Sequence, residues 1–342
     1  MADPDYRGYA SAGIGALQRW YVPSTGQWRT TGWWNAANAL TAVIGYTQRT
    51  GDDTHAGVIE TTFAAAQRRH AHFVVKYYDD NGWWALAWVA AYDLTGDSRY
   101  LDAARVIFEH NTSGWDDTCR GGLWWSRARK YKNAITNELF LTLAARLHQR
   151  TADRRAGYLT WAQREWEWFS SSGLVGASGL VNDGLTPACA NNGGVTWTYN
   201  QGVILGGLAA MYEITGDRAY LEHGESIASA ALSRLTSPAS ATPAGILTEP
   251  GELATKASDT DRPQFKGIFV RHLYDFFQHS RRRDYGAFIL RNARSIWDND
   301  RNADDEFGLR WTGPFDRADA GRQSSALDAL SAAVAVAAGP PG

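Results

Sequence analysis

The sequence predicts an all-α fold, an (α/α)6 barrel of six inner and six outer helices. Three observations support this prediction. Near-continuous apolar stretches recur about every 50 to 66 residues, which is room for one helix pair and its loops. Each apolar stretch is followed by an amphipathic one, and each comes just after a loop carrying aromatic, amide or acidic residues. Such a repeat predicts a closed ring of helix pairs with these loops gathered at one end.

The apolar stretches are the candidate inner helices. Residues 83 to 94 are apolar almost all round, and a helix of that kind must be buried on every side. We expect the inner helices to begin near six positions, which are Trp34, Trp84, Ile135, Gln201, Gly267 and Ser325.

The amphipathic stretches are the candidate outer helices. In residues 99 to 109, one side is apolar and the other carries Asp102, Arg105 and Glu109. The apolar side consists of Tyr100, Leu101, Ala104, Ile107 and Phe108. Recurring Thr-Gly-Asp turns predict the ends of inner helices, because Gly suits the C-terminal cap and Asp the next N-terminal cap. These turns are Thr50-Gly51-Asp52, Thr95-Gly96-Asp97 and Thr215-Gly216-Asp217.

The bulk properties favour one globular domain over residues 1–342. Helical repeats continue on both sides of the Ser/Ala/Pro/Thr-rich stretch 237–244, which we interpret as a loop. A net charge of -2 predicts no nucleic-acid surface, and no apolar run approaches the ~20 residues of a membrane span. No motif for a cofactor or a metal ion is recognised, and we expect a monomer.

Aromatic residues are unusually abundant. They make up 13% of the chain and include 16 Trp, many of them beside Gly, Asn and Asp in predicted loops, where burial alone does not explain them. Flat aromatic faces can pack against sugar rings, and a ligand pocket combines such walls with a few placed polar groups. The composition therefore indicates a binding site for a polyol.

The candidate catalytic group is a double aspartate flanked by aromatic residues, in the run Tyr77-Tyr78-Asp79-Asp80-Asn81-Gly82-Trp83-Trp84. Cleavage of a glycosidic bond requires one carboxylic acid to protonate the leaving oxygen and one carboxylate to attack or to activate water. We assign Asp79 as nucleophile and Asp80 as acid/base. In the alternative interpretation, Asp80 is only a helix cap and Asp79 a solvated neighbour.

In an (α/α)6 barrel the inner helices run parallel, so their N-terminal ends meet at one face. That face would bring the double aspartate together with a set of aromatic, amide and charged side chains. We expect the substrate-binding residues to be Trp33, Trp34, Tyr78, Trp83, Trp84, Asp117, Trp124, Trp125, Asn133, Asn137, Tyr199, Asn200, Phe265 and Lys266.

A second acidic pair, Asp116 and Asp117, lies in a Gly-rich loop and is the rival catalytic pair. We prefer Asp79 and Asp80 because a long inner helix follows them directly. Asp117 could instead bind substrate hydroxyls, or the loop could be a structural turn. Cys119 and Cys189 both lie in predicted loops, so they could form a disulfide or remain free thiols.

These motifs resemble glycoside hydrolase family 76, the endo-α-1,6-mannanases. The specific match is the run from Tyr77 to Trp88. It is supported by Trp115-Asp116-Asp117-Thr118-Cys119, by Gly121-Gly122-Leu123-Trp124-Trp125 and by Thr198-Tyr199-Asn200-Gln201-Gly202. The second block departs from the family pattern, because Arg120 follows Cys119 where glycines are common. That difference bears on the length and branching of the substrate accepted.

The resemblance implies an (α/α)6 barrel and a retaining endo-α-1,6-mannanase acting on the α-1,6-linked backbone of mannan. It carries the nucleophile and acid/base roles to Asp79 and Asp80, and it implies no metal and a secreted or cell-surface protein. The first residues lack the pattern of an export signal. Three alternatives stay open: a cell-wall transglycosylase of the same family, another (α/α)6 enzyme such as an inverting glycosidase or a sugar epimerase, and a non-catalytic glycan-binding protein.

Overall fold

A computed structural model describes residues 4–152, 157–254, 256 and 259–339. Twelve α-helices dominate the described residues, and a small antiparallel sheet pairs β1 (Tyr21–Val22) with β2 (Gln27–Trp28). The chain divides into two compact units, one formed by Met1–Ala66 with Leu232–Gly342 and the other by Gln67–Ala231. A single domain over 1–342 stays a prediction.

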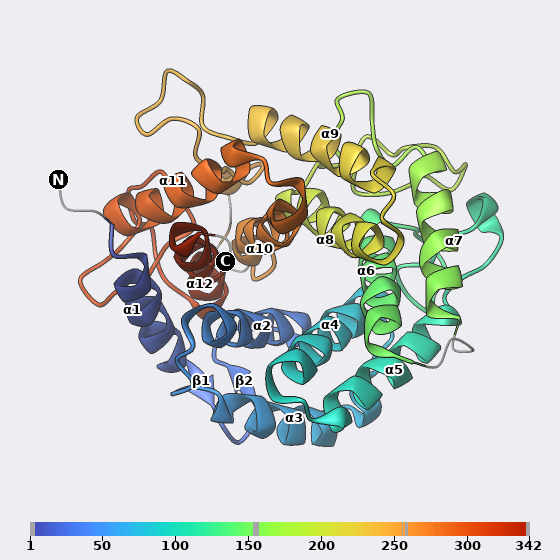
Figure 1. Ribbon diagram of the computed structural model, residues 1–342, viewed down its shortest axis with the longest axis horizontal. Coiled ribbons are helices and arrows are strands. Elements are labelled where there is room, and N and C mark those ends of the chain that lie inside the picture. Colours follow the sequence, from blue (N-terminus) through green and yellow to red (C-terminus); the bar gives the residue numbers. More distant parts are fainter. Residues whose placement is uncertain (1–3, 153–156, 255, 257–258, 340–342) are drawn as a thin grey trace. The chain divides into compact units, whose positions relative to one another are not determined.

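The second unit holds the double aspartate. Its helices are α4 (Tyr78–Thr95), α5 (Ser98–Thr112), α6 (Ala134–Arg150), α7 (Tyr158–Ser171), α8 (Thr198–Thr215) and most of α9 (Ala219–Arg234). Two short 3₁₀ turns accompany them, η1 (Ala71–Phe73) and η2 (Thr118–Arg120). Helix α6 packs against both α4 and α8, while α5 covers α4 and α7 covers α6 (Figure 1).

Burial in this unit follows the two kinds of helix that the sequence predicts. Helix α4 is buried on most sides, and its Trp88 packs against Phe73 with ring centroids 4.9 Å apart. Helix α5 buries one side only, through the five apolar residues expected, Tyr100, Leu101, Ala104, Ile107 and Phe108. The prediction of apolar helices covered by amphipathic ones is confirmed for α4 and α5.

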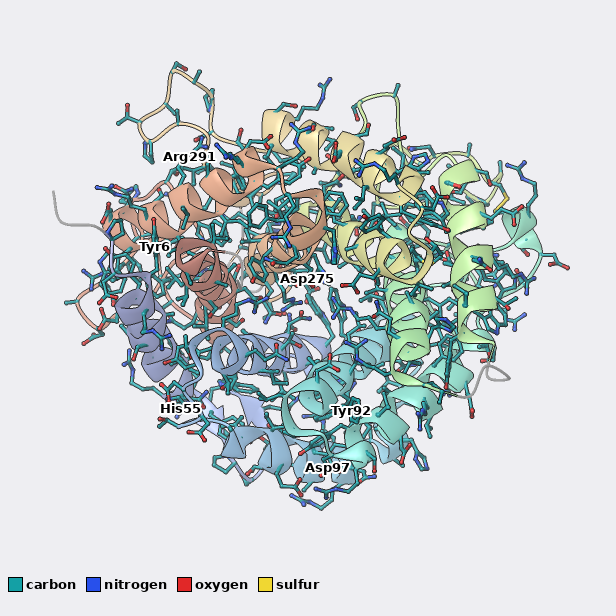
Figure 2. The ribbon with its side chains drawn as sticks, in the orientation of Figure 1. Tyr6, His55, Tyr92, Asp97, Asp275 and Arg291 are labelled. Carbon is teal, nitrogen blue, oxygen red and sulfur yellow. A yellow bond between two sulfur atoms is a disulfide. The ribbon has the colours of Figure 1, made fainter. Side chains whose placement is uncertain are left out.

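The Thr-Gly-Asp turns end inner helices as expected. Gly96 follows α4 with a φ of 71°, a left-handed conformation that costs glycine little. The Thr95 hydroxyl accepts a hydrogen bond from the Asp97 backbone N–H at 3.2 Å. The Asp97 carboxylate accepts one from the Arg99 backbone N–H at 3.0 Å. Figure 2 labels Asp97 at this turn between α4 and α5. The same turn recurs after α8 at Gly216, also with a φ of 71°.

The first unit is built around a buried helix, α12. Its helices are α1 (Tyr6–Gln18), α2 (Trp33–Thr50), most of α3 (Gly57–Arg69), α10 (Arg262–Ser280), α11 (Arg283–Asn299) and α12 (Ala320–Ala338), with a 3₁₀ turn, η4 (Glu252–Ala254). Helix α12 packs against α1, α2, α10 and α11 (Figure 1). Arg271 of α10 joins three of these helices, because it donates to Asp328 of α12 at 3.0 Å and to Asn38 of α2 at 2.6 Å.

Some inner helices begin earlier than the apolar pattern indicates. Helix α4 starts at Tyr78 rather than near Trp84, and α10 starts at Arg262 rather than near Gly267. Polar and acidic residues are favourable in a first helical turn, so the start of an apolar run does not mark the start of the helix. Asp79 and Asp80 therefore lie within the first turn of α4 rather than in a loop before it. Within the described residues, no helix has the length and apolar character needed to cross a membrane.

Candidate functional site

Asp79 is held by two hydrogen bonds. Its Oδ1 accepts the Asp80 backbone N–H at 3.0 Å, and its Oδ2 accepts the Trp125 indole N–H at 2.9 Å. Asp79 and Asp80 are both half-buried, and both lie at a helix N-terminus, where the helix dipole favours negative charge. The structure thus presents two adjacent carboxyl groups on a rigid element, and it fixes the orientation of the first.

Trp125 is itself fixed by the backbone on both sides. Its carbonyl accepts the Tyr78 N–H at 2.9 Å, and its N–H donates to the Tyr131 carbonyl at 2.8 Å. The indole packs against the Tyr77 ring with centroids 4.8 Å apart, yet 38% of the residue remains exposed. An exposed aromatic face beside a candidate catalytic carboxylate is suited to a sugar ring.

The loop before Trp125 is organised by a buried lysine. The Lys132 ammonium, whose side chain is 1% exposed, donates to the carbonyls of Thr118 and Gly121 at 2.6 Å and of Gly122 at 2.9 Å. It also forms an ion pair of 3.0 Å with Asp116. Because all these acceptors lie in residues 116–122, one side chain sets the shape of the loop.

The Asp116 carboxylate makes its hydrogen bonds within and beside this loop. Burial disfavours its charge, but hydrogen bonds from Trp124 and Lys132 outweigh burial and lower the pKa of Asp116 to about 2. The Trp124 indole donates to it at 2.6 Å. Asp116 therefore acts as an internal anchor, and the rival acidic pair contributes only Asp117, which is exposed.

A disulfide joins Cys119 to Cys189, 70 residues apart in sequence. It ties the 116–122 loop to the loop between α7 and α8. The carbonyl of Cys119 also accepts the Trp168 indole N–H at 3.0 Å. Arg120, the departure from the family pattern, is exposed and has a φ of 64°, a conformation that glycine adopts more easily.

Several predicted substrate contacts are corrected by burial. Trp84 is 0% exposed and packs against Trp88 and Phe73 in the core. Tyr78 is 3% exposed, and its ring stacks on His110. Each lies in an apolar run whose inward and outward positions cannot be told apart from the sequence, and both side chains are buried.

The predicted amide residues divide into two groups. Asn137 accepts the Leu123 N–H at 2.6 Å and donates to the Leu123 and Asn133 carbonyls, so it shapes the loop and cannot serve substrate. Asn133 and Asn200 are buried, and their side chains keep polar atoms that have no hydrogen-bond partner. Tyr199 is half-buried and stacks on Trp83, with centroids 6.4 Å apart.

The remaining predicted contacts belong to the first unit. Trp33 and Trp34 open α2, and the Trp34 indole donates to Asp261 at 3.0 Å. Phe265 lies beside Trp34. Lys266 corrects the prediction, because its ammonium is buried and donates to Glu252 at 2.9 Å and to the Leu309 carbonyl at 2.6 Å.

The sequence analysis missed three polar residues of this unit, Tyr131, Lys132 and Glu138. Tyr131 lies edge-on to Trp125 with centroids 6.4 Å apart, and its hydroxyl donates to Asp183. Glu138 is fully buried in α6. Lys132 follows the basic residues Arg129 and Lys130, and Glu138 follows Asn137, so neither stands out in the sequence as a buried charged residue. Within the described ranges, no cluster of three or more His, Cys, Asp or Glu side chains is arranged to hold a metal ion.

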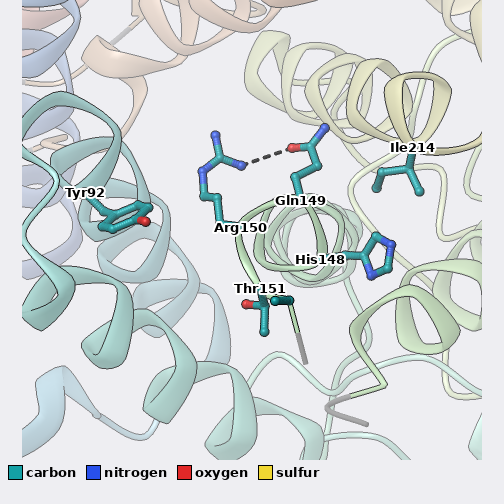
Figure 3. A pocket seen from close by; sticks show the side chains of 7 residues that line it. Tyr92, His148, Gln149, Arg150, Thr151 and Ile214 are labelled. Carbon is teal, nitrogen blue, oxygen red and sulfur yellow. Dashed lines mark hydrogen bonds between the residues drawn. The ribbon is translucent and has the colours of Figure 1, made fainter. Parts of the chain in front are cut away.

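A shallow cavity of about 670 Å³ lies at the opposite ends of α4, α6 and α8, lined by Tyr92, His148, Gln149, Arg150, Thr151, Ala152 and Ile214 (Figure 3). Its charged groups already have partners. Arg150 donates to Asp93 at 2.5 Å and to the Gln149 side chain at 3.0 Å. The cavity is therefore unrelated to the double aspartate.

The model of glycosyl hydrolase family 76 matches residues 14–341. The chain belongs to this family. Mannan endo-1,6-alpha-mannosidase DCW1 of Candida albicans is 29% identical to the chain over 213 residues, which are 56% of this chain and 47% of that protein. The family 76 chain thus spans about half the length of that curated relative.

Two solved structures of the α-1,6-mannanase GH76A from Salegentibacter sp. HEL1_6 share the fold. The active enzyme has a TM-score of 0.83 and 25% identity, covering 97% of this chain and 100% of the other. The second structure is an inactive variant in which two consecutive aspartates are replaced by alanine, in complex with α-1,6-mannotetrose. It has a TM-score of 0.84 and 24% identity, covering 97% of this chain and 100% of the other. The predicted fold class, an all-α (α/α)6 barrel, is confirmed.

Proposed function

We propose that this family 76 chain is a retaining endo-α-1,6-mannanase in which Asp79 is the nucleophile and Asp80 the acid/base. Family membership supports a glycosidase. The observation that carries the assignment of roles is the pair of hydrogen bonds on Asp79, from the Trp125 indole and the Asp80 amide. A nucleophilic carboxylate must be ionised and correctly oriented. Both hydrogen bonds favour the ionised form of Asp79 and fix its orientation.

In the proposed reaction, Asp79 attacks the anomeric carbon while Asp80 protonates the departing glycosidic oxygen. The resulting glycosyl ester is hydrolysed by a water molecule that Asp80 deprotonates, and the anomeric configuration is retained overall. Trp125, exposed beside Asp79, supplies the aromatic face for the sugar ring. The remaining proposed substrate contacts are Asp117, Tyr199, Trp33 and Trp34, whereas Trp83 and Phe265 are buried like Tyr78. No metal ion takes part in the proposed reaction.

The substrate is proposed from the relatives. GH76A is an α-1,6-mannanase whose variant without two consecutive aspartates is inactive and was solved with an α-1,6-linked mannose tetramer. The Candida albicans relative is named for cleavage within 1,6-linked α-mannan. We propose that the protein acts as a monomer on α-mannan at the cell surface or outside the cell.

A cell-wall transglycosylase is the second candidate, because the motifs around Asp79 resemble a family that includes such enzymes. A water molecule and an acceptor sugar would compete for the same glycosyl ester, so the two functions share both carboxylates.

Incubation with unbranched α-1,6-mannan tests the proposal. Chromatography should show a ladder of shorter oligomers, and NMR should show the α-anomer as the first product. Oligomers longer than a short donor would indicate transglycosylation, and initial release of the β-anomer would indicate inversion. Tight binding with no product after long incubation would mean that the chain is a glycan-binding protein.

A further inference from the structure

A loop rich in basic residues, 125–131, lies beside the double aspartate. It closes on itself, because the Trp125 N–H donates to the Tyr131 carbonyl at 2.8 Å. It also pairs antiparallel with the segment that leads into α4, where the Arg127 N–H donates to the Lys76 carbonyl at 3.0 Å. Residues opposite each other in such a pair share a face, so the Lys76 and Arg127 side chains leave the backbone on the same side.

Printed contacts connect this face to the proposed nucleophile. The Lys76 ammonium lies 4.9 Å from the centre of the Tyr77 ring, and that ring packs against the Trp125 indole with centroids 4.8 Å apart. The same indole donates to Oδ2 of Asp79 at 2.9 Å. Two aromatic rings in contact therefore separate the Lys76 ammonium from the Asp79 carboxylate.

The positive charges on this face have no acidic counterpart. Lys76, Arg127 and Lys130 are exposed, and none of them forms an ion pair within the part of the chain that the structure describes. We call these three residues the basic patch. The sequence from 118 to 137 contains no Asp or Glu.

Two neighbours of the patch do not change this conclusion. Arg129 has a local structural role, because it donates to the Ser113 carbonyl at 3.1 Å and lies 3.5 Å from Asp116. The Arg127 guanidinium lies 3.3 Å from Nε2 of His110. Burial, and then the charge of Arg127, lower the pKa of His110, so its ring is uncharged at neutral pH and does not compensate Arg127.

Exposed arginines elsewhere in the chain are paired with a nearby acid. Such pairs are Arg99 with Asp97 at 2.6 Å, Arg282 with Asp284 at 2.9 Å and Arg301 with Asp305 at 2.6 Å. The chain as a whole carries a net charge of -2, so a surplus of positive charge is not a general property of its surface. The basic patch is a local excess next to the site where a sugar chain is proposed to bind.

A neutral mannan offers hydroxyl groups and no charge for such a patch to meet. A phosphate group does, since guanidinium and ammonium groups bind phosphate oxygens by charge-assisted hydrogen bonds. We propose that Lys76, Arg127 and Lys130 form a subsite for a phosphate group carried by the mannan chain, near the bond that the double aspartate cleaves. This inference rests on the proposed function. The phosphate could be a monoester on a mannose hydroxyl or a diester at the end of the chain, and the chemistry of recognition is the same.

The first experiment compares three forms of α-1,6-mannotetrose by kcat/KM. One form is unmodified, one carries a phosphate on O6 of the non-reducing end, and one carries a methyl phosphodiester at C1 of the reducing end. We expect one phosphorylated form to be preferred over the unmodified form by roughly 3- to 10-fold at low salt, because each exposed ion pair contributes little and two or three act together. The preferred form identifies the source of the phosphate. Equal values for the three forms would overturn the proposal.

Salt provides a check on the electrostatic origin of this preference. At about 1 M NaCl the Debye length falls to about 3 Å, so the preference for the phosphorylated form should largely disappear. A preference that is unchanged by salt would contradict recognition by exposed charges.

Variants assign the preference to the patch. In Arg127→Gln combined with Lys130→Gln, the ratio of kcat/KM for the preferred phosphorylated form to that for the unmodified form should fall toward one. The exchange Arg127→Lys with Lys130→Arg keeps both charges and should keep most of the preference. Melting temperatures verify that each variant is folded.

The matched control removes two exposed charges far from Asp79 along the helices. Arg99 and Arg218 follow the C-terminal ends of α4 and α8, whereas Asp79 lies in the first turn of α4. Arg99→Gln combined with Arg218→Gln should keep the ratio of the wild type. A ratio that survives in the patch variant, or that falls equally in this control, would overturn the role of the patch.

Calorimetry separates this inference from the proposed function. Binding of the same three tetramers to Asp80→Asn, which is expected to cleave them very slowly, should show the same preference without turnover, and adding Arg127→Gln and Lys130→Gln should remove it. If the wild type cleaves none of the tetramers but this binding preference is present, the proposed function fails and the phosphate subsite stands. If the wild type cleaves all of them and no binding preference is found, the subsite fails and the proposed function stands.

Discussion

The indole N–H of Trp125 donates to Oδ2 of Asp79 over 2.9 Å, so a loop residue fixes the orientation of a carboxylate 46 positions earlier in the chain. Trp125→Phe keeps an aromatic ring against Tyr77 and removes this donor. Since a hydrogen bond to a charged group contributes about 1.5–3 kcal/mol, we expect kcat/KM to fall roughly 10- to 100-fold with little change in melting temperature.

Steady-state kinetics on α-1,6-mannan measure this effect. Trp166→Phe, which truncates a half-buried indole on α7, is the control and should leave kcat/KM near wild type. Full activity in Trp125→Phe would show that Asp79 needs no indole to orient it.

The two aspartates should each be essential. Asp79→Asn and Asp80→Asn remain isosteric, and we expect each to lower kcat by about a thousandfold or more while the circular dichroism spectrum is unchanged. Azide can distinguish the two roles. Replacing Asp79 by Ala opens the nucleophile's side of the sugar and should give a β-mannosyl azide, whereas Asp80→Ala should give the α-azide. The same azide anomer from both variants would contradict the assigned roles.

Lys132 should be among the most important residues for stability. Its buried ammonium pairs with the Asp116 carboxylate and with four carbonyls of the loop, so Lys132→Met leaves a carboxylate and several acceptors uncompensated. Breaking a fully buried ion pair costs about 3–5 kcal/mol, and because Asp116 is 27% exposed we expect a smaller loss. Urea unfolding of the variant measures the cost, with the exposed Lys130→Met as control. Equal unfolding midpoints for Lys132→Met and wild type would show that Lys132 does not hold the loop.

The sequence predicts those parts of the molecule that periodicity and local motifs encode. The buried side of α5 and the cap at Gly96 follow from a helical period and from turn chemistry, and the structure shows both. The double aspartate was found because two adjacent carboxylates among aromatic residues are a local signal.

Contacts between distant segments have no such signal. Trp84 and Asn137 were expected to bind substrate. Trp84 instead packs in the core, and Asn137 bonds a loop residue 14 positions away. Lys132 was missed because its acceptors are mostly backbone carbonyls, which carry no residue identity. Glu138 was missed because nothing in its local sequence indicates that this acidic side chain is fully buried.

Acid should weaken the fold partly through Asp116. Its pKa is lowered to about 2 in the folded protein, below the ordinary value of about 3.9 that applies when the chain is unfolded. A depressed carboxyl pKa stabilises the fold above the unfolded value, and this contribution is lost as the pH falls through the folded value. Between pH 4 and pH 2, the urea midpoint should therefore fall more steeply for wild type than for Asp116→Asn. If the urea midpoint falls equally with pH in both proteins, Asp116 does not contribute to the loss of stability in acid.

Arg120 should carry backbone strain. Its φ of 64° costs an L-residue about 1–2 kcal/mol, which exceeds the entropic penalty of about 0.5–1 kcal/mol for glycine. We therefore expect Arg120→Gly to raise the free energy of unfolding by up to about 1 kcal/mol. Lys130→Gly, at a position in the same loop without a positive φ, should lower it. A loss of stability in Arg120→Gly equal to that in Lys130→Gly would show that Arg120 is not strained.

The covalent link between Cys119 and Cys189 has a practical consequence for producing this protein. A recombinant host with an oxidising compartment would deliver chains whose two loops are already locked together, whereas glutathione in a bacterial cytosol would keep both sulfurs reduced. Preparations from the two hosts would then differ in heat tolerance and in resistance to proteases that attack loops, even though their amino-acid sequences are identical.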